Sequence, residues 1–228
     1  MQTLIERIST VKNCMSGEKT VSRSAIVLAG GFSSRFGQDK GVLELANKSL
    51  IRHVVDAVSP VVDETIVVTS SQERVANYAK VITADVQFAV DVCESNSPLI
   101  GALTGFGCAH GEYALLLPFD TPFVSREVVS LLFELCLNKA AVIPRWPNGH
   151  IEPLHAVYQT ELALEAAKTA VAEGKFNVRA LIEKLRGVRY VSTLVIQQLD
   201  PELRTFFNIN TPMDLKKAMG MVKPRKHK

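Results

Sequence analysis

Short apolar runs alternate with amphipathic segments along most of this chain, and this alternation restricts the fold more than any other feature. The runs are Ala25–Leu28, Thr65–Val68, Tyr113–Leu117 and Ala140–Ile143. Between them, residues 50–58 and 128–137 place apolar side chains at helical spacing. Strands that are apolar throughout are buried on both faces, which is typical of a mostly parallel sheet covered by helices on both sides. We therefore predict a three-layer α/β/α, Rossmann-like fold.

The chain reads as one domain with short additions at its ends. Its 228 residues suit a single α/β domain, and 47% apolar against 21% charged residues supports a sizeable core. We expect an N-terminal extension over residues 1–22, the domain over 23–220, and a basic tail over 221–228. Further expected elements are a strand at Leu154–Tyr158 and helices at Glu161–Ala172, at Val178–Leu185 and after the cap residue Thr211.

The distribution of charge argues against a nucleic-acid partner. The net charge is +3, but four positive charges lie in the tail, which leaves −1 for the rest. A solvated tail is the interpretation we prefer, and nucleic-acid binding is the alternative. We find no apolar run of about 18 residues, no secretory signal and no mitochondrial presequence, so we expect a cytoplasmic protein without membrane contact. The four cysteines form no zinc-binding pattern and are expected to be reduced thiols.

The segment directly after the first apolar run carries the strongest functional signal. Residues 28–40 read LAGGFSSRFGQDK. Gly30 and Gly31 allow the backbone to approach a ligand closely, and Arg35 and Lys40 offer positive charge to phosphate oxygens. The glycine spacing fits neither the dinucleotide-binding pattern nor the P-loop. We predict a phosphate-binding loop of another kind; the alternative is a surface turn with solvated charges.

The pattern L-A-G-G-x-S-x-R-x-G-x-D-K resembles the signature loop of nucleotidyltransferases, and in particular that of the molybdenum cofactor guanylyltransferase family. The resemblance extends from about Ser24 to about Met219. Phe36 stands where the family usually has Met, and we expect this to change packing only. The resemblance implies that Arg35 and Lys40 hold the triphosphate as catalytic residues. The loop residues that it assigns to the nucleotide are Leu28, Ala29, Gly30, Gly31 and Lys40.

Two acidic residues follow apolar runs, at the place where parallel sheets bind their ligands. Nucleotidyl transfer needs a divalent cation with hard oxygen ligands, and Asp120 is the candidate residue to hold Mg²⁺ and to act in catalysis. Asp91 is implied to contact the guanine nucleotide. The alternatives are a turn before Pro122 for Asp120 and a capping role for Asp91. Thr69, which ends the second strand, stands near the place where the family often has Asn for nucleotide contact, and the resemblance assigns Thr69 and Asp120 to the nucleotide as well.

Residues in the C-terminal half resemble the acceptor side of the family. Asn210 lies in N-I-N-T-P, and Asn177 and Arg179 lie in a stretch with family acceptor contacts. Arg179 would suit an anionic pterin phosphate. Stabilisation of a turn, for Asn210, and a solvated helix start, for the other two, are the alternatives. His155 lies in E-P-L-H-A-V-Y; since an ionised phosphate needs no general base, we expect a structural or hydrogen-bonding role for it.

The sequence therefore predicts Mg²⁺-dependent transfer of GMP from GTP to the phosphate of molybdopterin, with release of pyrophosphate. GTP and molybdopterin are the expected partners, with transient contact to molybdoenzymes or chaperones. Thr69 and an imperfect S-P-L-x-G motif at Ser97 keep alternatives open. These are a cytidylyltransferase for the same cofactor, a guanylyltransferase for a cobamide precursor, and a silent nucleotide-binding module.

Overall fold

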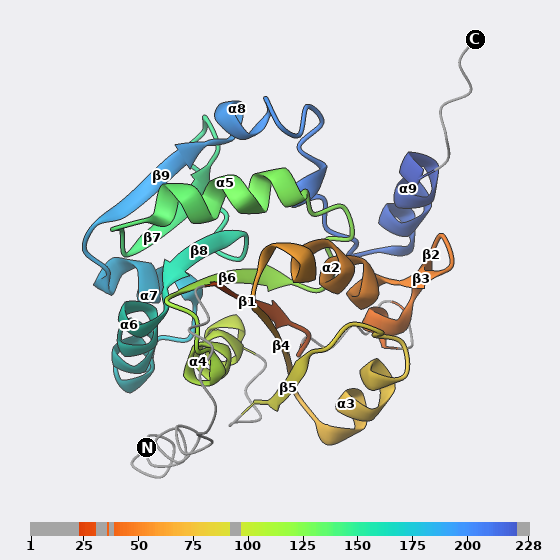
Figure 1. Cartoon of the computed structure of the whole chain (residues 1–228), viewed down its shortest axis with the longest axis horizontal. Helices are drawn as coiled ribbons and strands as arrows, with labels where there is room; N and C mark the ends of the chain where they lie inside the picture. The colour runs from red at the N-terminus through yellow and green to blue at the C-terminus, as the bar shows by residue number, and fades with distance from the viewer. Residues whose placement is uncertain (1–22, 31–35, 37–38, 92–96, 223–228) are drawn as a thin grey trace.

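A central sheet of seven strands organises the molecule (Figure 1). The computed structural model describes residues 23–30, 36, 39–91 and 97–222. The strand order is β5-β4-β1-β6-β8-β7-β9. Within these residues, β8 pairs antiparallel with β6 and β7, and every other pairing in the sheet is parallel, which confirms a mostly parallel sheet. The strands are β1 (Arg23–Leu28), β4 (Glu64–Thr69), β5 (Gln87–Val90), β6 (Tyr113–Pro118), β7 (Ala141–Arg145), β8 (Ala156–Gln159) and β9 (Val188–Ser192).

Strand β1 shows why the apolar runs are continuous. Ala25, Ile26 and Val27 are fully buried. Ile26 belongs to the hydrophobic cluster on one face of the sheet, and Ala25 and Val27 belong to the cluster on the other. Because successive side chains of a strand point to opposite faces, a strand between two helical layers needs apolar residues at every position.

Helices cover both faces, so the predicted three-layer α/β/α fold is confirmed (Figure 1). One layer contains α4 (Pro98–Cys108), α6 (Thr160–Ala172) and α7 (Val178–Lys184). The other contains α2 (Leu50–Val58), α3 (Gln72–Ala79) and α5 (Arg126–Cys136). Helix α4 packs tightly on β1 through Gly105: a Cβ at this position would lie 2.3 Å from Cγ2 of Ile26.

A third, smaller cluster joins two distant parts of the chain. It contains Leu43, Leu45 and Leu50 around the hairpin β2 (Glu44–Leu45) and β3 (Lys48–Ser49), together with Ile209 and Ala218. Ala218 lies on α9 (Pro212–Val222), which Figure 1 shows beside this hairpin. The cluster holds the chain around residue 209 against the segment that follows the glycine-rich loop. The remaining elements are the 3-10 helices η2 (Lys40–Val42), η3 (Ser59–Val61) and η4 (Arg204–Phe206), and the short helix α8 (Thr193–Ile196).

The expected elements are present, with small corrections at their ends. Strand β8 begins at Ala156, because Leu154 lies in a turn before it. Helix α9 continues to Val222, past the domain boundary that we expected at residue 220. The expected extension over residues 1–22 and the tail from residue 223 onward lie outside the described residues. Across the described part of the chain, we find no helix with the length and hydrophobicity that crossing a membrane requires.

Candidate active site

Two cavities lie side by side at the carboxyl ends of the parallel strands. The first cavity has a volume of about 220 Å³ and the second about 310 Å³. They share Pro118, Asp120 and Leu154. The first cavity is also lined by Leu28, Gly30, Val68, Asp91, Ser97, Pro98, Gly101 and Phe119. The second is also lined by His150, Ile151, Glu152, Pro153, His155, Arg179, Asn208 and Asn210.

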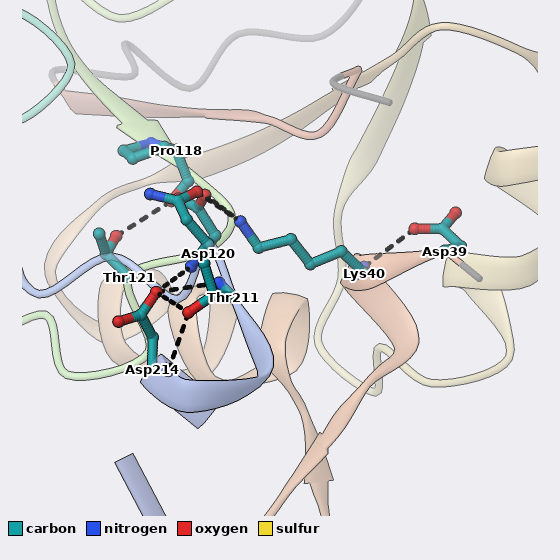
Figure 2. Close-up of polar contacts among 9 residues, drawn as sticks. Asp39, Lys40, Pro118, Asp120, Thr121, Thr211 and Asp214 are labelled. Atoms are coloured by element: carbon teal, nitrogen blue, oxygen red, sulfur yellow. Dashed lines mark hydrogen bonds and ion pairs between the residues drawn. The ribbon is translucent and has the colours of Figure 1, made fainter. Parts of the chain in front are cut away.

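Asp120, on the wall common to both cavities, forms an ion pair with Lys40. Lys40 Nζ lies 2.6 Å from Asp120 Oδ2 and donates a second hydrogen bond to Asn210 Oδ1, at 2.9 Å. Figure 2 shows the lysine side chain extended from its turn toward the carboxylate. The side chains of Lys40 and Asp120 are 6% and 15% exposed. Asp120 Oδ1 is buried and has no hydrogen-bond partner among the described residues, so one oxygen of this carboxylate is free for a ligand.

A network from α3 fixes the turn that carries Lys40. Asp39 caps η2 by accepting a hydrogen bond from Gly41 N at 2.9 Å. The Tyr78 hydroxyl donates to Asp39 Oδ1 at 2.9 Å, and Arg74 Nε lies 3.5 Å from Asp39 Oδ2. Burial raises the pKa of Tyr78 strongly, so its hydroxyl stays protonated and remains a donor. Lys40 therefore starts from a backbone position that three side chains hold in place.

Hydrogen bonds on both sides of Asp120 fix the end of β6. The Thr121 hydroxyl donates to the carbonyl oxygen of Pro118 at 3.1 Å. The backbone N–H of Ile209 donates to the carbonyl oxygen of Asp120 at 3.0 Å. The loop after β6 is thereby joined to the segment that carries Asn210.

Asn210 is placed by the cap of α9. Asp214 Oδ2 accepts hydrogen bonds from the Thr211 hydroxyl, at 2.8 Å, and from the backbone N–H groups of Asn210 and Thr211 (Figure 2). Thr211 in turn caps the helix by accepting from Asp214 N. Because the backbone of Asn210 is held by this cap, its side-chain oxygen is free to accept from Lys40.

Asp91 gives the first cavity a second carboxyl group. Its backbone N–H donates to the carbonyl oxygen of Thr69, which fixes it at the end of β5, and its Oδ1 is buried without a partner among the described residues. A Cβ at Gly30 would lie 3.1 Å from Asp91 Oδ2, and one at Gly101 would lie 3.6 Å from Oδ1, so glycines keep the approach to this carboxyl open. Burial raises the pKa of Asp91 to about 6.

Apart from Lys40, which pairs with Asp120 but lines neither cavity, the predicted site residues divide into three groups. Leu28, Gly30, Asp91 and Asp120 line the first cavity, and Asp120, Asn210 and Arg179 line the second. Three others use their polar groups within the protein: the Ala29 carbonyl accepts from Arg74, the Thr69 hydroxyl donates to the Ser71 carbonyl, and Asn177 Oδ1 caps α7. Gly31 and Arg35 lie outside the described residues.

The structure also adds residues that the sequence did not single out. Glu152 and Asn208 line the second cavity. Asn208 could have been found from the same N-I-N-T-P motif as Asn210, and Glu152 from its place in E-P-L-H. The contacts of Asp39 with Arg74 and Tyr78 had no local signal, because they join a loop to a helix far along the chain.

The acidic residues fit a magnesium ion that is shared with a triphosphate. Among the described residues, no group of three or more His, Cys, Asp or Glu side chains could hold a metal alone. Mg²⁺ is commonly held by one or two carboxylates together with substrate phosphates. The unpartnered Oδ1 of Asp120 is a hard oxygen donor in a cavity wall, as such a site requires.

Comparison with known proteins agrees with this geometry. Residues 25–189 match the family model of the MobA-like NTP transferase domain. The probable molybdenum cofactor guanylyltransferase of Methanosarcina mazei is 36% identical over 213 residues, which cover 91% of this chain and 95% of that protein. The protein of the same description from Methanosarcina acetivorans is 36% identical over 210 residues, covering 90% and 93%.

A solved structure shares both fold and sequence. Molybdopterin-guanine dinucleotide biosynthesis protein A from Archaeoglobus fulgidus superposes with a TM-score of 0.73 at 28% identity, covering 87% of this chain and 97% of that one. The family model spans most of the described domain and includes Gly30, Asp91 and Asp120, which follow β1, β5 and β6. The chain therefore belongs to the MobA-like family of nucleotidyltransferases.

Proposed function

We propose that this protein transfers GMP from GTP to the phosphate of molybdopterin, forming the guanine dinucleotide of the cofactor and releasing pyrophosphate. The observation that carries the proposal is Asp120 on the wall common to the two cavities, with the buried Lys40 ammonium group paired to it. A transferase that joins two substrates needs two adjoining sites with the reacting groups between them. The names of the Methanosarcina and Archaeoglobus relatives support guanosine and molybdopterin as the two partners.

In this reaction the acceptor phosphate enters through the second cavity and attacks the α-phosphorus of GTP held in the first. A bond forms between an acceptor phosphate oxygen and the α-phosphorus. The bond from the α-phosphorus to the oxygen that bridges it to the β-phosphate breaks, and pyrophosphate leaves with that electron pair. Because the acceptor phosphate is already ionised near neutral pH, the step requires no general base.

The residues of this chain contribute position and charge. Lys40 places a positive charge beside the reacting phosphates, and Asn210 fixes the direction of its ammonium group. Asp120, with its free Oδ1, would hold Mg²⁺ together with oxygens of the triphosphate. When bound, the ion neutralises charge on the α-phosphate and on the departing pyrophosphate. Arg179, which lines the second cavity, adds a positive charge for an anionic acceptor.

A transfer assay tests the proposal. The protein is incubated with Mg²⁺, molybdopterin and either α-labelled GTP or α-labelled CTP, and the labelled dinucleotide and pyrophosphate are measured. We expect GTP to be the better donor and Asp120→Asn to lower turnover at least a hundredfold. The matched control is His110→Gln, since His110 is 58% exposed and bonds Glu64, which lies at the amino-terminal end of β4, away from the cavities. Preference for CTP, or undiminished turnover by Asp120→Asn, would overturn the proposal.

A further inference from the structure

His155 is a buried polar side chain with unmet hydrogen-bonding capacity. It is 2% exposed, it lines the second cavity, and neither Nδ1 nor Nε2 has a hydrogen-bond partner among the described residues. A neutral imidazole carries one donor and one acceptor, and each such group left unpaired in a protein interior destabilises the fold. Packing alone does not require this residue, because its ring meets the edge of Phe206 at a centroid distance of 5.3 Å, a contact that a phenyl ring also makes.

Glu152 favours one position for the proton on the His155 ring. Glu152 Oε2 lies 3.9 Å from Nδ1, too far for a hydrogen bond but close enough to favour the proton on that nitrogen. Nε2 is then left with its lone pair. Burial lowers the pKa of His155 to about 3, so the ring is neutral at physiological pH.

The carboxylate of Glu152 is itself held in place. Trp146 Nε1 donates to Glu152 Oε1 at 2.7 Å, which leaves Oε2 as the oxygen toward His155. Glu152 and His155 both line the second cavity. The lining of this cavity thus contains a carboxylate and, just beneath the surface, an imidazole whose two nitrogens lack partners among the described residues, together with Asp120 and Asn210.

Two neighbouring acceptors match a group with two neighbouring donors. The 2-amino-4-oxopyrimidine edge of a pterin offers its exocyclic amine and a ring N–H side by side. We propose that Glu152 and His155 are specificity-determining residues that bind this edge of the acceptor, while its phosphate lies toward Asp120. This inference rests on the proposed function. It assigns the ring of the acceptor to the part of the second cavity lined by Glu152 and His155, and leaves the carboxyl groups of the first cavity for the nucleotide.

The test compares two ring systems that differ at this edge. Neopterin monophosphate carries the 2-amino group, and the corresponding lumazine monophosphate carries an oxygen there, which would meet the Glu152 carboxylate as a second acceptor. Binding of each to the full-length protein is measured by calorimetry. We expect the wild type to prefer the pterin about 10- to 100-fold, as for one hydrogen bond to a charged group. Glu152→Gln and His155→Phe should each reduce that preference to less than about threefold.

Further measurements separate this role from a structural one. His155→Gln keeps a polar side chain, so it should recover part of the preference that His155→Phe loses. In the transfer assay, the KM for molybdopterin should rise about tenfold or more in Glu152→Gln and His155→Phe, with the KM for GTP unchanged. His110→Phe, at an exposed site outside both cavities, is the matched control.

The outcomes distinguish this inference from the proposed function. If the wild type transfers GMP to molybdopterin but shows no preference for pterin over lumazine, or keeps that preference in both variants, the inference is wrong and His155 is satisfied by buried water. A rise in the KM for GTP rather than for molybdopterin would place guanine at this edge and also refute it. If the preference for pterin is found but no GMP is transferred, the proposed function fails and the binding role stands.

Discussion

The ion pair between Lys40 and Asp120 gives the most specific prediction. A double variant that lacks both charges should regain stability and still be inactive. Lys40→Met keeps most of the aliphatic stem and removes the ammonium group. The Asp120 side chain then has no hydrogen-bond partner among the described residues, since Oδ2 loses Lys40 and Oδ1 has none already. Asn210 also loses the donor to its Oδ1.

The size of the effect follows from burial. Removing one partner of a buried ion pair costs about 3–5 kcal/mol, and the 15% exposure of Asp120 favours the lower end. We therefore expect Lys40→Met to lower the free energy of unfolding by about 3 kcal/mol. For a domain of this size that corresponds to a decrease in Tm of about 6–12 °C.

A double-mutant cycle tests whether the two side chains interact, because the same substitution should change stability in opposite directions in the two backgrounds. Asp120→Asn in the wild type leaves the ammonium group of Lys40, which is only 6% exposed, without its countercharge and should likewise cost about 3 kcal/mol. The same substitution in Lys40→Met removes an uncompensated buried charge, so there it should stabilise the protein. The measurement is chemical denaturation of the four proteins, and the double variant should remain inactive in the transfer assay. If Asp120→Asn lowers stability equally in both backgrounds, the two side chains are not coupled and the reasoning is wrong.

Two further predictions concern the residues around this pair. Because burial raises the pKa of Asp91 to about 6, the folded protein loses stability relative to the unfolded chain as the pH rises from about 4 to 6. Asp91→Asn should therefore raise the Tm, measured by thermal denaturation, at pH 8 and not at pH 4, and it should lower the affinity for GTP. An equal increase in Tm at both pH values would contradict this prediction. Tyr78→Phe removes the hydroxyl that donates to Asp39. We expect the kcat of GMP transfer to fall several-fold, with little change in the KM for molybdopterin. A kcat equal to that of the wild type would show that the turn holds Lys40 in place without the Tyr78 hydroxyl.

The sequence predicted the features that depend on local pattern. The run Ala25–Leu28 and Asp120, the second residue after β6, could be placed because each strand is apolar in sequence and sheets of this kind bind ligands at the carboxyl ends of their strands. The direction of β8 could not be predicted, since an apolar run is the same whether its neighbours run parallel or antiparallel. The start of β8 at Ala156 could not be predicted either, because it depends on the turn that the preceding residues form.

The site was predictable as a set of residues but not as an arrangement. Lys40, Asp120 and Asn210 come from positions 80 and 170 residues apart, and their contact depends on packing of the α9 segment against the β2–β3 hairpin. For Thr69 and Asn177 the structure shows bonds from the side chain to nearby backbone. Short polar side chains form such bonds readily, so a polar residue near a site need not face it.

Buried polar atoms without hydrogen-bond partners indicate that the two cavities bind ligands more directly than any sequence motif does. Asp91 Oδ1, Asp120 Oδ1 and both nitrogens of His155 are buried without partners among the described residues, and all three side chains line a cavity. Buried polar groups in folded proteins are normally paired, because each orphan destabilises the fold. Under the proposed function, the nucleotide with its cation would supply partners to the two carboxyl groups, and the ring of the acceptor would supply one to the imidazole. Since pairing is a property of the tertiary structure, the sequence could name these residues without showing that they lacked partners.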